Sequence, residues 1–195
     1  PGKGVVEGKQ TRRAFPAHPT KPITAWGLIG AGIRAYDYMD GVQNKYGVKT
    51  VILEVDGEEV FRSTIDRFAY EENRYINSWT HGQYMKSFIE PGNRLRMLQA
   101  SNGNRGLVEI NEERPYRFVY TLSDALGNTS KVRFTVQGQK TIIAPVEHRE
   151  KYALKWDKVN YLQEPGLELV IPKGMLYDDV LLNYSVRADS GDIAF

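Results

Sequence analysis

The sequence predicts an all-β protein, with an antiparallel β-sandwich followed by a second, incomplete β-module. The first observation is the stretch 116–136, YRFVYTLSDALGNTSKVRFTV, in which apolar and polar residues alternate on both sides of the corner SDALGN. Such alternation predicts a hairpin with one apolar face that another sheet must cover. The second observation is a series of about seven short strand-like segments between residues 23 and 137, separated by frequent turn signals, which is typical of a sandwich.

The strands are predicted in order from their alternation and from the turns between them. The segment 23–37 holds Gly27, Gly30 and Gly32, which argue against a helix and indicate a bulge or the close approach of another backbone. Asp56-Gly57 predicts a two-residue hairpin turn. Asp37 to Gly41 predicts a strand-end corner similar to the one at Asp124. The other extended segments are expected at 47–55, 58–63, 85–89, 94–99 and 107–110.

The chain divides into three predicted segments. Residues 1–22 are rich in proline, glycine and basic residues and predict an extended lead-in, in which Val5 and Val6 form a short edge strand. Residues 23–138 form the sandwich, and residues 139–195 form a connector and a partial second β-module. Both ends of the sequence look like cut points, so we expect a piece of a larger, exported protein.

The stretch 64–84 breaks the strand rhythm and predicts a short helix or an ordered loop around residues 71–79. It interleaves aromatic residues with hydrogen-bonding side chains, a composition that favours sugar or peptide ligands. The alternative is that the insertion only packs its aromatic residues onto the sandwich. The candidate ligand-binding residues are Tyr70, Glu71, Arg74, Tyr75, Trp79 and Tyr84.

Composition excludes several other kinds of function. The net charge of +2, without a block of lysine or arginine, argues against a nucleic-acid partner. The chain has no cysteine, which excludes disulfides and thiol chemistry. No apolar run reaches the length of roughly 18 residues that a membrane span needs. We therefore expect neither a nucleic-acid partner nor a membrane span.

No catalytic, cofactor or metal site is predicted. The histidines His18, His81 and His148 lie far apart and lack the paired spacing of zinc ligands. The strand-end carboxylates, of which Asp56 and Asp124 are examples, have the residue type that binds calcium, but capping of their own turns is the favoured interpretation. The expectation is a chain that is not itself an enzyme.

Several motifs of residues 23–137 resemble a known family region. They are Ala25–Asp37, Met39–Gly41, Asn44–Val48, Val55–Gly57, Asp66–Phe68, Glu90–Arg96, Asn111–Arg114, Leu122–Asp124 and Gly127–Ser130, extended by Val170–Gly174 and Tyr177–Val180. Together they resemble the region downstream of the catalytic domain in Gram-negative LytM-type (lysostaphin-like) zinc metallopeptidases. The strand pattern of 116–136 is also similar to bacterial immunoglobulin-like modules, which makes the expected sandwich Ig-like.

This resemblance implies a non-catalytic accessory region, for scaffolding or targeting, of a cell-envelope peptidoglycan metallopeptidase. Its implied partners are peptidoglycan, an envelope protein or glycan, and an upstream catalytic domain of the same polypeptide. The implied location is extracytoplasmic, in the periplasm or at the cell surface. The sequence lacks the family's zinc motif, so no catalytic residue carries over. The alternative is a carbohydrate- or peptide-binding module that uses the aromatic insertion.

Overall fold

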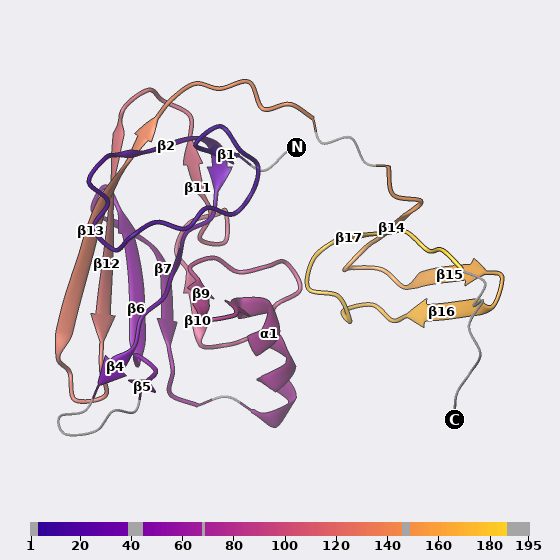
Figure 1. Ribbon diagram of the computed structural model, residues 1–195. Helices are drawn as coiled ribbons and strands as arrows, with labels where there is room; N and C mark the ends of the chain where they lie inside the picture. Colours follow the sequence, from indigo (N-terminus) through magenta and orange to yellow (C-terminus); the bar gives the residue numbers. More distant parts are fainter. Residues whose placement is uncertain (1–3, 39–44, 68, 146–148, 187–195) are drawn as a thin grey trace, which may run out of the picture. The chain divides into compact units, whose positions relative to one another are not determined.

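The computed structural model describes residues 4–38, 45–67, 69–145 and 149–186 (Figure 1). Within this part of the chain the regular structure is almost entirely β-strand, with one short 3-10 helix and one short α-helix. The predicted all-β fold class is confirmed, and the sheets are compatible with a β-sandwich. The chain forms two compact units, residues 1–146 and 147–195. The lead-in therefore belongs to the same unit as the main sheet.

The first unit is built on one eight-stranded sheet that curls around its core (Figure 1). Each neighbouring pair is antiparallel except β2 with β13, which is parallel, and β11 joins through β2. The strands lie in the order β1 (Val5–Val6), β2 (Ile23–Ile29), β13 (Thr129–Gly138), β12 (Pro115–Ser123), β6 (Thr50–Val55), β7 (Glu58–Thr64) and β10 (Leu98–Ala100), with β11 (Val108–Ile110) paired to β2.

The predicted hairpin is confirmed and lies in the middle of this sheet. β12 and β13 pair from Pro115 opposite Gln137 to Ser123 opposite Thr129, and β6 pairs with the other edge of β12. The alternation places Tyr116, Phe118 and Tyr120 on the buried face, each 4% exposed or less. Tyr116 and Tyr120 are therefore core residues. Large aromatic side chains such as these dominate the energetics of a core.

One polar contact is enclosed in that core. The hydroxyl of Tyr120 lies 2.8 Å from Oγ of Ser87, and both side chains are almost completely buried. The hydrogen bond satisfies two groups that would otherwise be costly to remove from water. Burial raises the pKa of Tyr120, so this side chain stays neutral.

The predicted turns form as expected where the structure describes them. Asp56 and Gly57 have φ angles of 54° and 94°, in the left-handed region that a two-residue hairpin turn requires. Asp124 caps its own corner, because its Oδ1 accepts from the backbone N–H groups of Leu126 and Asn128, both at 2.8 Å. These bonds confirm Asp124 as a turn residue. Of the corner 37–41, only Asp37–Tyr38 (β4), paired with Lys45–Tyr46 (β5), lies inside the described residues.

Gly27 marks the point at which β2 changes partners. Before it, β2 pairs with β13 and β1, and from Gly27 onward it pairs with β11. Gly27 has a φ of 81°, and a Cβ there would lie 3.0 Å from the Cα of Gly4 and 2.7 Å from Cδ1 of Ile143. The predicted close approach of another backbone is therefore confirmed. The approaching backbone is the lead-in, whose predicted strand at Val5 and Val6 also forms.

In its described residues, the second unit contains two separate two-stranded sheets. β14 (Tyr152–Leu154) pairs with β17 (Val180–Leu182), and β15 (Asn160–Glu164) pairs with β16 (Leu167–Ile171). Among its described residues, only Leu154 and Leu162 are buried apolar side chains. Two-stranded sheets of this size are marginally stable alone. Many apolar side chains of this unit remain exposed, including Tyr161 and Val170, which lie directly opposite each other.

Candidate functional site

The insertion after β7 folds as a compact helical turn followed by a small hairpin. It contains the 3-10 helix η1 (Tyr70–Tyr75), the helix α1 (Ile76–Trp79), β8 (Thr80–His81) and β9 (Tyr84–Lys86). β9 pairs with β8 and with β3 (Gly32–Ile33), which fixes the insertion to the segment after β2. The predicted short helix around residues 71–79 is confirmed (Figure 1).

The six candidate residues of this insertion divide by burial. Tyr75 and Trp79 are 8% and 4% exposed, and Nε1 of Trp79 donates to the carbonyl of Lys86 at 3.0 Å. These two rings pack inside the unit, as the packing alternative expects. Tyr70 is 90% exposed and Tyr84 is 39% exposed.

The two charged candidates of the insertion also differ in their surroundings. Glu71 is exposed. The guanidinium of half-buried Arg74 lies over the ring of Tyr75, 4.7 Å from its centroid. A ligand that approaches the insertion would therefore meet Glu71 and the exposed tyrosines before it met the buried rings.

Glu72, a residue that sequence analysis did not select, joins the insertion to the segment before β10. Its carboxylate accepts from the N–H of Ala69 at 2.7 Å, and from Nε and Nη2 of Arg96 at 2.9 and 3.2 Å. The hydrogen bond from Arg96, followed by that from Ala69, lowers the pKa of Glu72 from 4.5 to about 2. Nearby, Asn93 donates to the carbonyl of Tyr75 at 2.9 Å.

Glu90 makes two further contacts between the insertion and the segment before β10. Oγ of Ser78, buried in α1, donates to Oε2 of Glu90 at 2.6 Å. Nζ of Lys86 forms an ion pair with the other oxygen of the same carboxylate. Both partners of that ion pair are mostly shielded from solvent, which strengthens it relative to a surface pair. The segment 90–96 is thus attached to the insertion at several points.

Glu72 makes the stability of the first unit sensitive to acid. A carboxyl whose pKa is lowered in the folded state stabilises the fold above its ordinary pKa, and this contribution is lost as the pH falls from about 5 to about 2. We expect Glu72→Gln to lower the urea midpoint at pH 7. Between pH 5 and pH 2.5, the variant should lose less of its remaining stability against urea than the wild type loses. The exposed neighbour provides the control, Glu71→Gln, which should keep the wild-type pH profile. Equal acid sensitivity in both variants would contradict the role of Glu72.

An open groove of about 430 Å³ lies beside the Glu72–Arg96 contact. Met97 is a buried residue of its lining, whereas Arg67 and Gln99 are exposed. The side chain of Arg96 is 77% exposed although two of its nitrogens bind Glu72. The complete lining is Thr64, Asp66, Arg67, Arg96, Met97 and Gln99. We call this the arginine groove.

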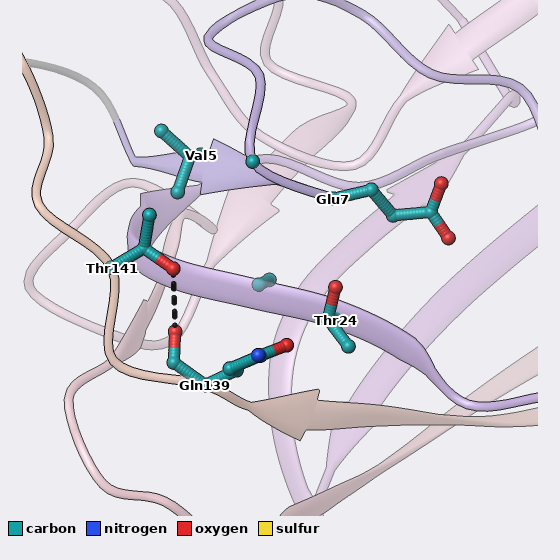
Figure 2. A pocket seen from close by; sticks show the side chains of 7 residues that line it. Val5, Glu7, Thr24, Gln139 and Thr141 are labelled. Atoms are coloured by element: carbon teal, nitrogen blue, oxygen red, sulfur yellow. Dashed lines mark hydrogen bonds between the residues drawn. The ribbon is translucent and has the colours of Figure 1, made fainter.

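A smaller cavity of about 300 Å³ lies where the lead-in meets β2 and the segment after β13 (Figure 2). Figure 2 shows Val5 and Thr141 on one side of it and Thr24 and Glu7 on the other. Oγ1 of Thr141 donates to the carbonyl of Gln139 at 3.1 Å, and the N–H of Glu7 donates to the carbonyl of Thr24 at 2.7 Å. The bond from Glu7 holds the lead-in on β2, and the N–H of Gln139, which donates to the carbonyl of Ala25 at 3.1 Å, holds the chain after β13 on the same strand.

In the part of the chain that the structure describes, no three His, Asp or Glu side chains lie together in a way that would hold a metal ion. The described residues also include no helix that is both long enough and apolar enough to cross a bilayer. Sequence reasoning did not select Arg67, Arg96 and Gln99 as site residues, because they lie in two segments that are distant in the sequence. Arg67 and Arg96 lie in two of the motifs that carry the family resemblance, Asp66–Phe68 and Glu90–Arg96, but that resemblance implied no binding role for either residue.

Comparison with known proteins matches only part of the chain. Residues 151–195 match the model of the Zu5-like domain. This match covers most of the second unit and leaves the arginine groove and the insertion outside it. The comparison with curated proteins and the comparison with solved structures each returned no match.

Proposed function

We propose that this chain is a non-catalytic accessory region, for scaffolding or targeting, of an extracytoplasmic metallopeptidase that acts on peptidoglycan. The proposal rests first on the resemblance of residues 23–137 to the region downstream of LytM-type catalytic domains. The observation that supports it most directly is the structural role of the residues in the motifs that carry this resemblance. These residues hold segments of the first unit together.

The motif 90–96 illustrates this structural use. Glu90 binds Ser78 and Lys86, Asn93 binds the carbonyl of Tyr75, and Arg96 binds Glu72. Each of these contacts attaches the insertion to the segment that leads into β10. The residues of this motif therefore make structural contacts within the unit, as expected for a scaffold.

The motif 111–114 has the same use at the hairpin. Arg114 binds Asp56 at 2.7 Å and Glu112 at 2.7 Å, and its guanidinium lies 3.8 Å from the ring centroid of Tyr116. The hydroxyl of Tyr116 accepts from the N–H of Glu112 at 3.1 Å. A tyrosine hydroxyl that bonds the backbone a few residues upstream is a corner device of Ig-like sandwiches. These contacts join the turn of β6 and β7 to the start of β12.

The proposal is tested on the parent protein. We expect the full-length gene product to contain an upstream domain with zinc-ligand motifs, and the purified 195-residue chain to cleave no peptidoglycan. Deletion of residues 23–138 from the parent should lower its hydrolysis of intact cell walls more than its hydrolysis of a short soluble peptide. Zinc-dependent cleavage by the chain alone, or equal activity of the deleted parent on cell walls, would overturn the proposal.

The second candidate function is a carbohydrate- or peptide-binding module that uses the insertion. The exposure of Tyr70 and Tyr84 favours it, because solvent-exposed aromatic rings offer a stacking surface to a sugar. Glycan-array binding should then be lost in Tyr70→Ala and Tyr84→Ala variants. Binding that neither substitution changes would remove this candidate.

A further inference from the structure

We propose that residues 129–135 of β13 bind an extended protein segment in which acidic and apolar residues alternate. We call these residues the open edge. The partner pairs with the open edge as an additional strand of the main sheet, which is one of the recurring ways in which proteins bind peptides. The chemistry of this edge does not depend on the accessory role proposed above.

Most of β13 has a strand neighbour on one side only. Its pairing with β12 extends from Thr129 to Gln137, whereas its pairing with β2 begins at Val136, opposite Ile23 (Figure 1). Among the described strands, β12 alone pairs with the open edge, and no described residue outside that ladder forms a backbone hydrogen bond with it. In an antiparallel ladder alternate residues bond to one neighbour, so the others direct their N–H and C=O groups to the open side.

The lead-in gives the physical reason why β2 does not cover this edge. β2 runs parallel to β13, so the residues before Ile23 are the ones that a longer β2 would place beside the open edge. Three of them, Pro16, Pro19 and Pro22, have no backbone N–H and cannot complete such a ladder. The open edge is therefore left for a strand whose backbone donors are free.

Two cations on one face of the open edge select the charge of the partner. Lys131 and Arg133 are exposed, and among the described residues neither side chain has a hydrogen bond or an ion pair. Opposite charges that face each other across a strand pair stabilise it, so carboxylates at alternate positions of the added strand fit these cations. The same cations disfavour a second copy of β13 at this edge, because like charges of the two copies would lie beside each other.

The other face of the open edge is apolar. Val132 and Phe134 lie opposite the core residues Tyr120 and Phe118, and both are only half-buried. The ring of Phe134 stacks on that of Phe118, with the centroids 5.1 Å apart. Apolar side chains on an added strand would extend this packing and remove more apolar surface from water. Because the faces of a strand alternate, the matching partner alternates acidic and apolar residues.

The test uses a fluorescent synthetic peptide in which glutamate alternates with valine, as long as the open edge, titrated with the full 195-residue chain at neutral pH. We expect binding, measured by fluorescence anisotropy. A peptide of the same composition, with the glutamates in one block and the valines in another, should bind about tenfold more weakly, because it cannot match both faces. A peptide methylated at its backbone nitrogens should not bind, because it has lost its ladder donors.

Two results of these titrations would overturn the proposal. Equal binding of the alternating peptide and either of the other two would show a general anion surface. Failure of the alternating peptide to bind would show that the cations serve only to protect the edge from association, as charged residues on edge strands commonly do.

Charge reversal assigns the binding to β13. Arg133→Glu should weaken binding of the glutamate peptide by about tenfold, since an attractive pair becomes a repulsive one. Arg117→Glu is the matched control, because Arg117 is an exposed arginine of β12, whose two edges already pair with β13 and β6. Thermal melts of both variants check that they fold. Equal loss of affinity in the two folded variants would overturn the proposal.

The double variant Lys131→Glu with Arg133→Glu reverses the charge of the edge. It should bind a peptide that alternates lysine with valine in place of the glutamate peptide. Such an exchange of preference cannot arise from loss of folding, because a new ligand is gained. A double variant that is folded but binds neither peptide would contradict the pairing of charges across the edge.

Amide hydrogen exchange distinguishes an added strand from a polyanion bound to the face of the hairpin. The glutamate peptide should slow exchange at the open edge and leave β6 unchanged, because β6 already pairs on both sides. Polyphosphate, which carries anions but no peptide backbone, should not slow exchange at the open edge. Equal slowing by polyphosphate, or slowing by the peptide only elsewhere, would overturn the proposal.

Discussion

Trp79→Ala is expected to lower the free energy of unfolding of the first unit by about 3–5 kcal/mol. The Trp79 side chain is 4% exposed, so its truncation leaves a large cavity in a packed region. It also removes the donor that bonds the carbonyl of Lys86 at 3.0 Å. Urea unfolding followed by circular dichroism measures the loss, and hydrogen exchange over residues 70–86 should locate it in the insertion.

Tyr70→Ala is the matched control in the same insertion. Tyr70 is 90% exposed, and surface substitutions of this kind change stability by no more than about 0.5 kcal/mol. The pair of variants distinguishes an aromatic residue used for packing from one available to a ligand. A loss below about 1 kcal/mol in Trp79→Ala would contradict the packing role.

Gly138→Ala is expected to destabilise the first unit strongly, because the added Cβ would make the shortest contact among the described glycines. A Cβ at Gly138 would lie 1.9 Å from the carbonyl oxygen of Glu112 and 3.3 Å from that of Arg114. These are backbone atoms, which cannot rotate away as a flexible side chain can. The N–H of Gly138 also donates to the carbonyl of Arg114 at 2.8 Å, so any shift of β13 lengthens that bond.

We expect Gly138→Ala to move the thermal midpoint down by several degrees or to yield no folded first unit, since overpacking costs typically 1–3 kcal/mol and more against backbone. Gly103→Ala provides the comparison, because a Cβ there would meet nothing within 4 Å and its φ is not positive. Differential scanning calorimetry on both variants tests the expectation. Equal midpoints would mean that β13 moves freely relative to the segment 112–114.

The strand pattern could be predicted from the sequence because it depends on local periodicity and on turn chemistry. The alternation in 116–136 placed Phe118 and Tyr120 on the same face, and the structure buries both. Asp56-Gly57 and Asp124 act through bonds to their own turns, so neighbours in the sequence were enough to predict them. Gly27 was informative for another reason, because a glycine within a strand indicates the close approach of another backbone, but its partner, Gly4, could not be predicted.

The groove could not be predicted, because its residues come together only through tertiary contacts. Thr64 ends β7, Arg67 follows it, and Arg96 and Gln99 arrive from a segment that returns along the same sheet. No spacing in the sequence indicates that Arg96 meets Glu72, which lies 24 residues earlier. Such pairings depend on the path of the chain between them.

The insertion shows what the sequence could predict and what only the tertiary structure decided. Its composition indicated aromatic residues beside polar ones and a short helical turn, since both are properties of a local stretch. Which rings face inward depends on the surfaces against which the insertion packs, and only the tertiary structure decided that Tyr75 and Trp79 are buried while Tyr70 is exposed. Burial is a property of the assembled unit, because water is excluded from a side chain by residues distant in sequence.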